Sequence, residues 1–220
     1  MRKLLFVVAF LALPLHAQDW SVGGGVGPFI FGHFVERTVR IGTETSGATN
    51  HTRLSAATRA GATADIQRDF NRWLSLRLEA SWVGSPLRIK SQSGDQGTTI
   101  DAGRLNMTTF VLPLVIRLNP NGAFRFHVMG GPAYAFYNVH RRAGSGVTLP
   151  FFEGTREVWG GAGAVGAGWY LRRNFGIEWQ AEYIVTRSPF RAADFAPIST
   201  GITIPKPRNG HTTIGIRYRF

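Results

Sequence analysis

The chain has 220 residues, a formal net charge of +12 and no cysteine. The length suits one domain, and the lack of cysteine excludes disulfides and thiolate metal sites. Twenty-seven glycines and 12% aromatic residues fit an all-β protein, and no long stretch has the periodicity of an amphipathic helix. In a cytoplasmic protein, so strong a positive charge would indicate nucleic-acid binding.

The first residues have the pattern of a secretory signal peptide. Arg2 and Lys3 form a short basic region, and Leu4–Leu15 is an apolar run that is too short to span a bilayer. We therefore expect a signal peptide at residues 1–17 and one mature domain at 18–220. Export removes nucleic acid as the expected partner and favours the phosphates of lipopolysaccharide.

Segments with alternating apolar and polar residues recur eight times along the mature chain. We expect strands at about 20–31, 53–67, 73–83, 105–118, 124–137, 158–171, 175–186 and 211–220. Short polar turns separate some of them, at 68–72, 119–122 and 172–174, and long polar loops separate the others, at about 32–52, 84–104, 138–157 and 187–210. An even strand count with alternating short and long connections predicts an all-β fold, an eight-stranded antiparallel up-and-down transmembrane β-barrel.

Two prolines interrupt this pattern. Pro113 and Pro132 lie inside proposed strands, where a missing N–H removes one hydrogen bond of the ladder. A closed barrel has no edge strand to receive them, so we expect bulges there or strand boundaries that differ from those above.

The positions of two tryptophans favour lipid on the apolar face of the barrel. Trp159 and Trp169 share one face of a strand and lie ten residues apart. At roughly 3.3 Å per residue and a tilt of about 40°, their separation along the membrane normal is on the order of 25 Å. That distance matches the gap between the two aromatic girdles of membrane barrels. A soluble lipocalin-like binder, which would turn the same apolar face inward, remains an alternative.

The terminal strand carries a family resemblance. Ile214, Ile216, Tyr218 and Phe220 share one face, and the chain ends on the aromatic ring. This pattern resembles the closing strand of bacterial outer-membrane β-barrels, and the whole chain resembles the small eight-stranded barrels of the OmpA-barrel and OmpX kind. The resemblance implies an outer-membrane location, a monomer, and recognition of Tyr218 and Phe220 by the barrel-assembly machinery. It also implies structural, adhesive or lipid-contacting roles without enzymatic activity.

If the apolar faces meet lipid, the charged faces line the lumen. We expect a lumen charge network of Arg77, Glu79, Arg117, Arg125, Glu178, Glu182, Arg217 and Arg219, together with Arg59 and Asp65. Side chains fill the interior of an eight-stranded barrel, and buried charges are tolerated only when they are paired. A plugged lumen is therefore the expectation, and an ion path or gate is the alternative.

The long loops carry an excess of basic residues. Arginine binds phosphate groups, often through two hydrogen bonds at once. We expect Arg141, Arg142, Arg187 and Arg191 to contact lipid phosphates, with a merely solvated loop surface as the alternative.

Motifs that suggest catalysis or cofactors are weak. Gly161–Gly166 matches G-x-G-x-x-G, but it leads into a strand rather than a helix, so we expect close strand packing instead of nucleotide binding. His127 has no serine two positions on, as lipid A deacylases of this fold would require. The other histidines of the mature chain lie near the expected rim without an acidic partner at a telling spacing, at positions His33, His51, His140 and His211. We expect no catalytic residue, cofactor or metal site.

The function expected from the sequence is that of a non-enzymatic outer-membrane barrel with a charged, side-chain-filled lumen and basic extracellular loops. A narrow OmpW-like channel for small hydrophobic solutes is an alternative. A continuous apolar lumen would favour the channel, and the charged residues of the lumen argue against it.

Overall fold

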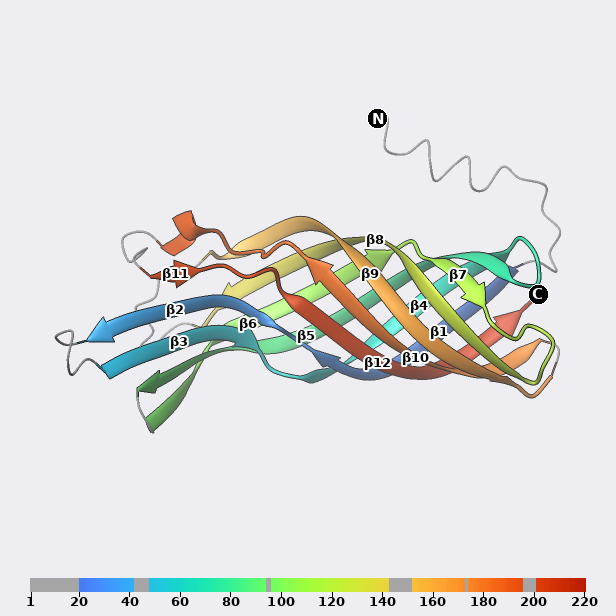
Figure 1. Cartoon of the computed structure of the whole chain (residues 1–220), viewed down its shortest axis with the longest axis horizontal. Helices are drawn as coiled ribbons and strands as arrows, with labels where there is room; N and C mark the ends of the chain where they lie inside the picture. Colours follow the sequence, from blue (N-terminus) through green and yellow to red (C-terminus); the bar gives the residue numbers. More distant parts are fainter. Residues whose placement is uncertain (1–19, 42–47, 94–95, 143–151, 173, 196–200) are drawn as a thin grey trace, which may run out of the picture.

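The protein folds into one closed antiparallel β-barrel (Figure 1). The computed structural model describes residues 20–41, 48–93, 96–142, 152–172, 174–195 and 201–220, so the expected signal peptide lies outside the described residues. The strands are β1 (Trp20–Ile30), β2 (His33–Ile41), β3 (Ala48–Ala56), β4 (Arg59–Asp69), β5 (Leu74–Ser93), β6 (Gln96–Val111), β7 (Leu114–Arg117), β8 (Phe124–Arg141), β9 (Gly154–Tyr170), β10 (Phe175–Thr186), β11 (Ile202–Thr203) and β12 (Arg208–Arg219). A 3-10 helix, η2, covers Ala192–Phe195.

Eight strand positions form the ring of the barrel, with β6 and β7 together occupying one of them. Their order is β1, β4, β5, β6 with β7, β8, β9, β10 and β12, and each pairs with its neighbours in antiparallel fashion. Pairing of β12 with β1, from Ser21↔Arg219 to Ile30↔Gly210, closes the ring. The sequence-based expectation of an eight-stranded up-and-down barrel is confirmed. None of the described helices is long and apolar enough to cross a membrane.

The two ends of the barrel differ. Short turns join β4 to β5, β7 to β8 and β9 to β10 at the end that also holds Trp20 and Phe220, which we call the turn end (Figure 1). At the opposite end, the loop end, strands extend well beyond the ring as long hairpins such as β2–β3 and β5–β6 (Figure 1).

These hairpins correct the expected long loops. Residues 84–93 continue β5 and 96–104 belong to β6, while β2 and β3 occupy most of 33–56. The expected strand 53–67 is divided at Ala57 and Thr58 between β3 and β4. The backbone stays extended in these stretches because each hairpin forms its own ladder, which needs no apolar outer face.

Neither proline produces a bulge, and only Pro113 lies at a strand boundary. Pro113 separates β6 from β7, and the register is the same on both sides, with Val111↔Ala133 before it and Leu114↔Gly130 after it. β8 runs through Pro132, whose carbonyl oxygen accepts a hydrogen bond of 3.1 Å from the N–H of Leu112. Each proline therefore costs single ladder bonds rather than the alignment of its strand.

The faces of β5 exchange polarity along its length. From Leu74 to Trp82 the outward side chains are apolar and the inward ones are polar, among them Arg77 and Glu79. From Val83 on the order is reversed, with buried Val83, Leu87 and Ile89 inside, and Gly84, Pro86, Arg88 and Lys90 outside. The turn-end half is thus apolar outside, and the loop-end half is apolar inside.

Candidate functional site

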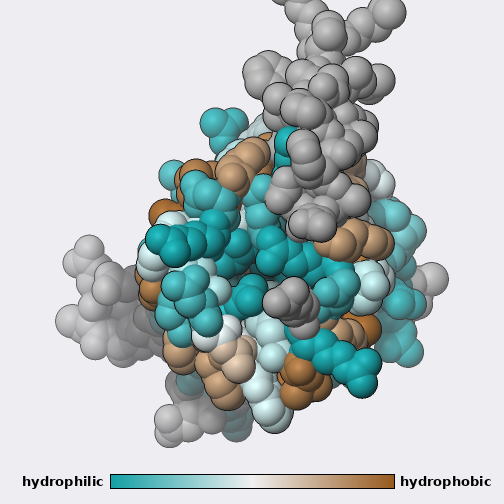
Figure 2. Space-filling view, turned by 90° about the vertical axis from the view of Figure 1, so that its right-hand side faces the viewer, coloured by the Kyte–Doolittle hydropathy of each residue, from teal (hydrophilic) through white to brown (hydrophobic). Residues whose placement is uncertain are grey.

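An apolar belt surrounds the turn-end half of the barrel. It consists of exposed side chains from the ring strands, including Leu78, Leu114, Ile116, Val165, Ile177, Trp179, Ile214 and Ile216. Figure 2 looks onto the end that carries the C-terminus and shows hydrophilic residues over the centre with hydrophobic residues at the margin. A soluble lipocalin-like binder would have the opposite arrangement, so this alternative is not supported.

Aromatic rings border the belt on both sides. At its loop-end border, exposed Trp159 packs against Tyr134 with ring centroids 4.5 Å apart. At its turn-end border, Trp169 stacks on Phe124 at 5.8 Å, and both are exposed. Two aromatic borders on an outward apolar band are the arrangement of a transmembrane barrel, as the spacing of the tryptophans predicted.

The lumen inside the belt holds a buried ionic layer. Arg217 forms an ion pair with Glu178 and donates a hydrogen bond of 2.8 Å to Asp65. Arg77, from the opposite wall, donates 2.8 Å hydrogen bonds to Glu178 and to Gln180. Both arginines are almost completely buried, at 3% and 2% exposure, so their charges are compensated by partners rather than by water.

A missing side chain makes room for this layer. A Cβ atom at Gly23 would lie 2.6 Å from Asp65 Oδ2 and 2.9 Å from Arg217 Nη2. Gly23 is the ladder partner of both residues, so glycine on β1 lets the Asp65–Arg217 pair form over that strand, between β4 and β12.

A second group of charges closes the turn end. Arg117 forms an ion pair with Asp69, and Arg219 Nη2 lies 3.0 Å from Asp69 Oδ2. Gln67 and Ser75 donate hydrogen bonds to the same carboxylate at 2.9 and 2.8 Å. Asp69 is thus the acceptor around which this group is arranged.

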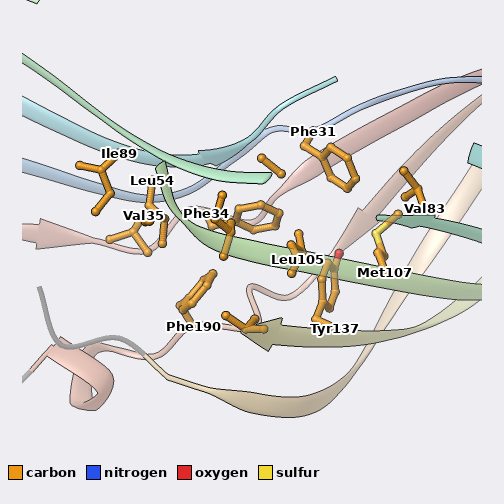
Figure 3. Close-up of a cluster of buried hydrophobic side chains, with 14 of the residues drawn as sticks. Phe31, Phe34, Val35, Leu54, Val83, Ile89, Leu105, Met107, Tyr137 and Phe190 are labelled. Carbon is orange, nitrogen blue, oxygen red and sulfur yellow. The ribbon is translucent and has the colours of Figure 1, made fainter. Parts of the chain in front are cut away.

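The loop-end half of the lumen is filled by apolar side chains (Figure 3). Phe34 lies at its centre with no exposed surface, and its ring centroid is 6.0 Å from that of Tyr137 and 5.9 Å from that of Phe190. The Tyr137 hydroxyl accepts a hydrogen bond of 2.9 Å from Asn209 and bonds with Thr186 at 3.0 Å. We call this cluster the apolar plug; its other members include Phe29, Phe31, Val35, Leu54, Val83, Leu87, Ile89, Leu105, Met107, Val139 and Phe195.

Three potential metal ligands meet at the boundary between the ionic layer and the apolar plug. Glu79, Glu182 and His211 are all buried, and one ligand atom of each lies within 4.8 Å of the other two. The Nε2 atom of His211 is 3.3 Å from Glu182 Oε2 and 3.7 Å from Glu79 Oε1. The ring of His211 stacks on Phe29 with centroids 4.4 Å apart.

Comparison with known proteins identifies solved structures that share this architecture. No protein-family model and no curated protein matches the chain. Among solved structures, OprG of Pseudomonas aeruginosa is 15% identical, with 93% of this chain and 96% of that chain covered and a TM-score of 0.63. The outer-membrane protease OmpT of Escherichia coli is 10% identical, with coverages of 95% and 99% and a TM-score of 0.54. Neisserial surface protein A is 8% identical, with coverages of 91% and 97% and a TM-score of 0.51.

The chain has the fold of the small outer-membrane β-barrels. These identities are too low to transfer a role, so the resemblance is one of architecture.

In this outer-membrane barrel fold, the predicted lumen residues lie as follows. Six are buried in the lumen, namely Arg77, Glu79, Arg117, Glu178, Glu182 and Arg217. Arg125 and Arg219 are half-buried at the turn end, where Arg125 lies over the ring of Tyr170 at 4.2 Å. Arg59, which we expected in the lumen, is exposed because β4 begins there, at the break from β3.

Several lumen residues were missed by sequence reasoning. Asp69 and Gln67 lie near the expected turn, and Gln180 is uncharged, so the predicted lumen charge network did not include them. His211 is not at the rim of the barrel as expected but buried inside it, and His127 Nε2 lies 3.2 Å from Glu178. Their positions on inward faces of β12 and β8 were the available signal.

The glycine motif of β9 has a packing role. β9 runs without interruption through Gly161–Gly166, so the segment lacks the helix that would hold pyrophosphate. A Cβ atom at Gly166 would lie 2.3 Å from His127 Nε2, which shows that this glycine makes room for a lumen side chain.

The four arginines expected to bind lipid phosphate all lie at the loop end of this outer-membrane barrel. Arg141 ends β8 and Arg142 follows it, while Arg187 and Arg191 follow β10, and all four are exposed. Arg142 Nη1 lies 3.9 Å from Asp101 Oδ2, a contact weakened by exposure of both side chains.

A salt bridge holds the segment of residues 188–195, which contains Arg191, against β9. Arg156 donates hydrogen bonds of 2.7 Å to Asp194 Oδ1 and to the carbonyl oxygen of Pro189. Burial acts to raise the pKa of Asp194, but hydrogen bonds from Arg156 and from the N–H of Arg191 outweigh it and hold that pKa below its usual range. The segment thereby holds Phe190 and Phe195 in the apolar plug.

Proposed function

We propose that this protein is a non-enzymatic barrel of the bacterial outer membrane, with its turn end in the periplasm and its loop end at the cell surface. The outward apolar belt between two aromatic borders carries the proposal, because such a surface is stable only against lipid. Export through the expected N-terminal signal peptide would deliver it.

Membrane fractionation and gel mobility test this placement. The protein is expected in the outer-membrane fraction, and it should migrate faster before boiling than after, because a folded barrel stays compact in detergent. Release into the soluble periplasmic fraction would contradict the proposal.

We further propose that the loop end contacts the phosphate groups of lipopolysaccharide, in a structural or adhesive role. Support comes from Arg141, Arg142, Arg187 and Arg191, which are exposed on the loop-end side of the Trp159 border. Guanidinium groups at this level would meet phosphates bidentately.

The test compares the wild type with a variant in which these four arginines are replaced by glutamine. Lipopolysaccharide in the refolding vesicles should raise the unfolding temperature of the wild type and have a much smaller effect on the variant. A control variant, Arg72→Gln with Arg172→Gln, changes exposed arginines at the turn end and should keep the full effect. An equal response of all three proteins would contradict the lipid-contact role.

The channel alternative finds partial support in the apolar plug. This half of the lumen is apolar, as a path for small hydrophobic solutes requires, but Phe34 and Tyr137 fill it and the ionic layer lies beneath it. Single-channel recording in planar bilayers separates the two cases. The plugged barrel predicts little or no conductance, and steady openings would favour the channel.

A further inference from the structure

We propose that Glu79, Glu182 and His211 form a binding site for one divalent transition-metal ion, of the Zn²⁺ class, inside the barrel. The three side chains come from β5, β10 and β12, and they converge where the polar and apolar halves of the lumen meet. Glu182 and His211 are directly opposite each other in the β10–β12 ladder, and Glu79 reaches them across the lumen.

The first argument is the balance of charge. Arg77 and Arg217 are engaged by Asp65 and Glu178, two arginines facing two carboxylates. Of these two arginines, Arg77 is the one that approaches the trio of Glu79, Glu182 and His211. Its contact with that trio is long, with 4.0 Å between Arg77 Nη1 and Glu79 Oε2.

Two further carboxylates therefore share a buried space. Among the described residues, Glu182 has no arginine or lysine within salt-bridge distance. Gln180 donates hydrogen bonds to Glu79 at 3.0 Å and to Glu182 at 3.2 Å, but an amide carries no charge. A divalent cation would neutralise both carboxylates at once.

The second argument is the state of the histidine. The side chain of His211 is 1% exposed, and neither ring nitrogen makes a hydrogen bond of good geometry. A buried imidazole without a hydrogen bond is unusual, because leaving such a group unsatisfied costs stability. Its Nε2 atom nevertheless lies within 4 Å of a carboxylate oxygen of both glutamates, so the three ligand types are already gathered at one place.

The third argument is the chemistry and size of the site. One imidazole nitrogen with two carboxylates suits Zn²⁺, whereas Ca²⁺ and Mg²⁺ prefer oxygen ligands alone. Ligand atoms of a tetrahedral zinc site lie about 3.4 Å apart, and the Glu182–His211 separation is already 3.3 Å. A cavity of about 20 Å³, lined by Glu79 but not by Glu182 or His211, has room for one water on the Glu79 side of the site.

Metal content after refolding tests the proposal. Untagged protein is unfolded in urea with a chelator, refolded in detergent with excess Zn²⁺, and freed of loose metal by gel filtration. The wild type should retain about one Zn²⁺ per chain, and refolding with Co²⁺ should give the visible absorption of tetrahedral cobalt. Retention near zero in the folded wild type would overturn the proposal, leaving a proton shared by the two carboxylates as the explanation.

Variants assign the metal to the trio. Glu182→Gln and His211→Asn should each lower the affinity for Zn²⁺ by about tenfold or more. His127→Asn changes the other lumen histidine and should leave zinc binding as in the wild type. Gel mobility before boiling reports folding, and the nearly isosteric Glu182→Gln variant keeps the test sound if His211→Asn does not fold. Unchanged binding in both trio variants would place the metal on the exposed histidines and overturn the assignment.

Discussion

The backbone N–H of Phe220 donates a hydrogen bond of 3.0 Å to the carbonyl oxygen of Trp20, so the last residue of the chain is bonded to the first residue of the barrel. Both ends of the ring therefore meet at the closing seam between β1 and β12. The side chain of Phe220 is half exposed and packs edge-on against Tyr218, with centroids 5.4 Å apart.

Deletion of Phe220 is expected to impair assembly much more than stability. The deletion removes one of many hydrogen bonds at the seam and an exposed ring, a loss on the order of 1 kcal/mol. The family resemblance implies that the barrel-assembly machinery recognises the terminal aromatic ring, and on that hypothesis the variant lacks the recognised group. Outer-membrane yield in cells should fall several-fold, while urea unfolding of the refolded variant should stay close to the wild type. Equal losses in both measurements would argue against an assembly signal.

The ionic layer predicts a large cost for the loss of one arginine. Arg217→Met leaves Glu178 and Asp65 to share Arg77 in a buried space, and we expect a loss of about 3–5 kcal/mol in the free energy of unfolding. Arg219→Gln removes a half-exposed partner of Asp69 and should cost less than about 1 kcal/mol. Urea titration in lipid vesicles, followed by tryptophan fluorescence, measures both. Similar costs for the two variants would show that the buried layer is not a special source of stability.

The apolar belt predicts a dependence on depth. Val165 lies on the outward face of β9 between the two aromatic borders, so Val165→Arg should destabilise the barrel by about 2–4 kcal/mol. Leu118 lies at the turn-end border and is similarly exposed, so Leu118→Arg should lower the free energy of unfolding by only about 0–1 kcal/mol. Unfolding in vesicles of defined thickness provides the comparison. If both variants lose the same stability, the band between the tryptophans is not the membrane core.

The Arg156–Asp194 contact predicts loosening of the plug in acid. The folded-state pKa of Asp194 is lowered from an ordinary value of 3.8, so its contribution to stability is present above that value and is lost as the pH falls through the lower folded pKa. Amide protection factors, which are exchange rates corrected for the intrinsic effect of pH, should therefore fall around Ser188–Phe195 in acid before those of the ring strands do. Asp194→Asn should show at neutral pH the low protection that the wild type shows in acid. Protection factors around Ser188–Phe195 that stay constant with pH would contradict this role.

Much of the fold could be predicted because lipid imposes a simple rule on one face of each strand. The outward residues of the terminal strand, from Ile214 to Phe220, are exposed as expected, and β10 has the expected bounds of Phe175–Thr186. Period-two alternation is a local property, so a single sequence displays it directly.

The loop-end half could not be predicted in the same way. The predicted strand ended at Val83 because the prediction required apolar residues on the outward face. Gly84 and Pro86 occupy that face next, so the expected pattern stops there. The strand in fact continues with the faces exchanged. Likewise, Glu79, Glu182 and His211 come from three distant strands, and only barrel closure sets which of them meet.

The exchange of polarity at Trp82 and Val83 means that the two halves of the same strands are stabilised against different surroundings, lipid around the belt and water beyond it. Around the belt, apolar side chains gain little from contact with each other, since the surrounding lipid is equally apolar. Beyond it, the apolar plug is stabilised by the expulsion of water, an effect that weakens on cooling. Low temperature should therefore weaken the packing of the loop-end half before that of the belt half, so the stability of the two halves of one chain should depend differently on temperature.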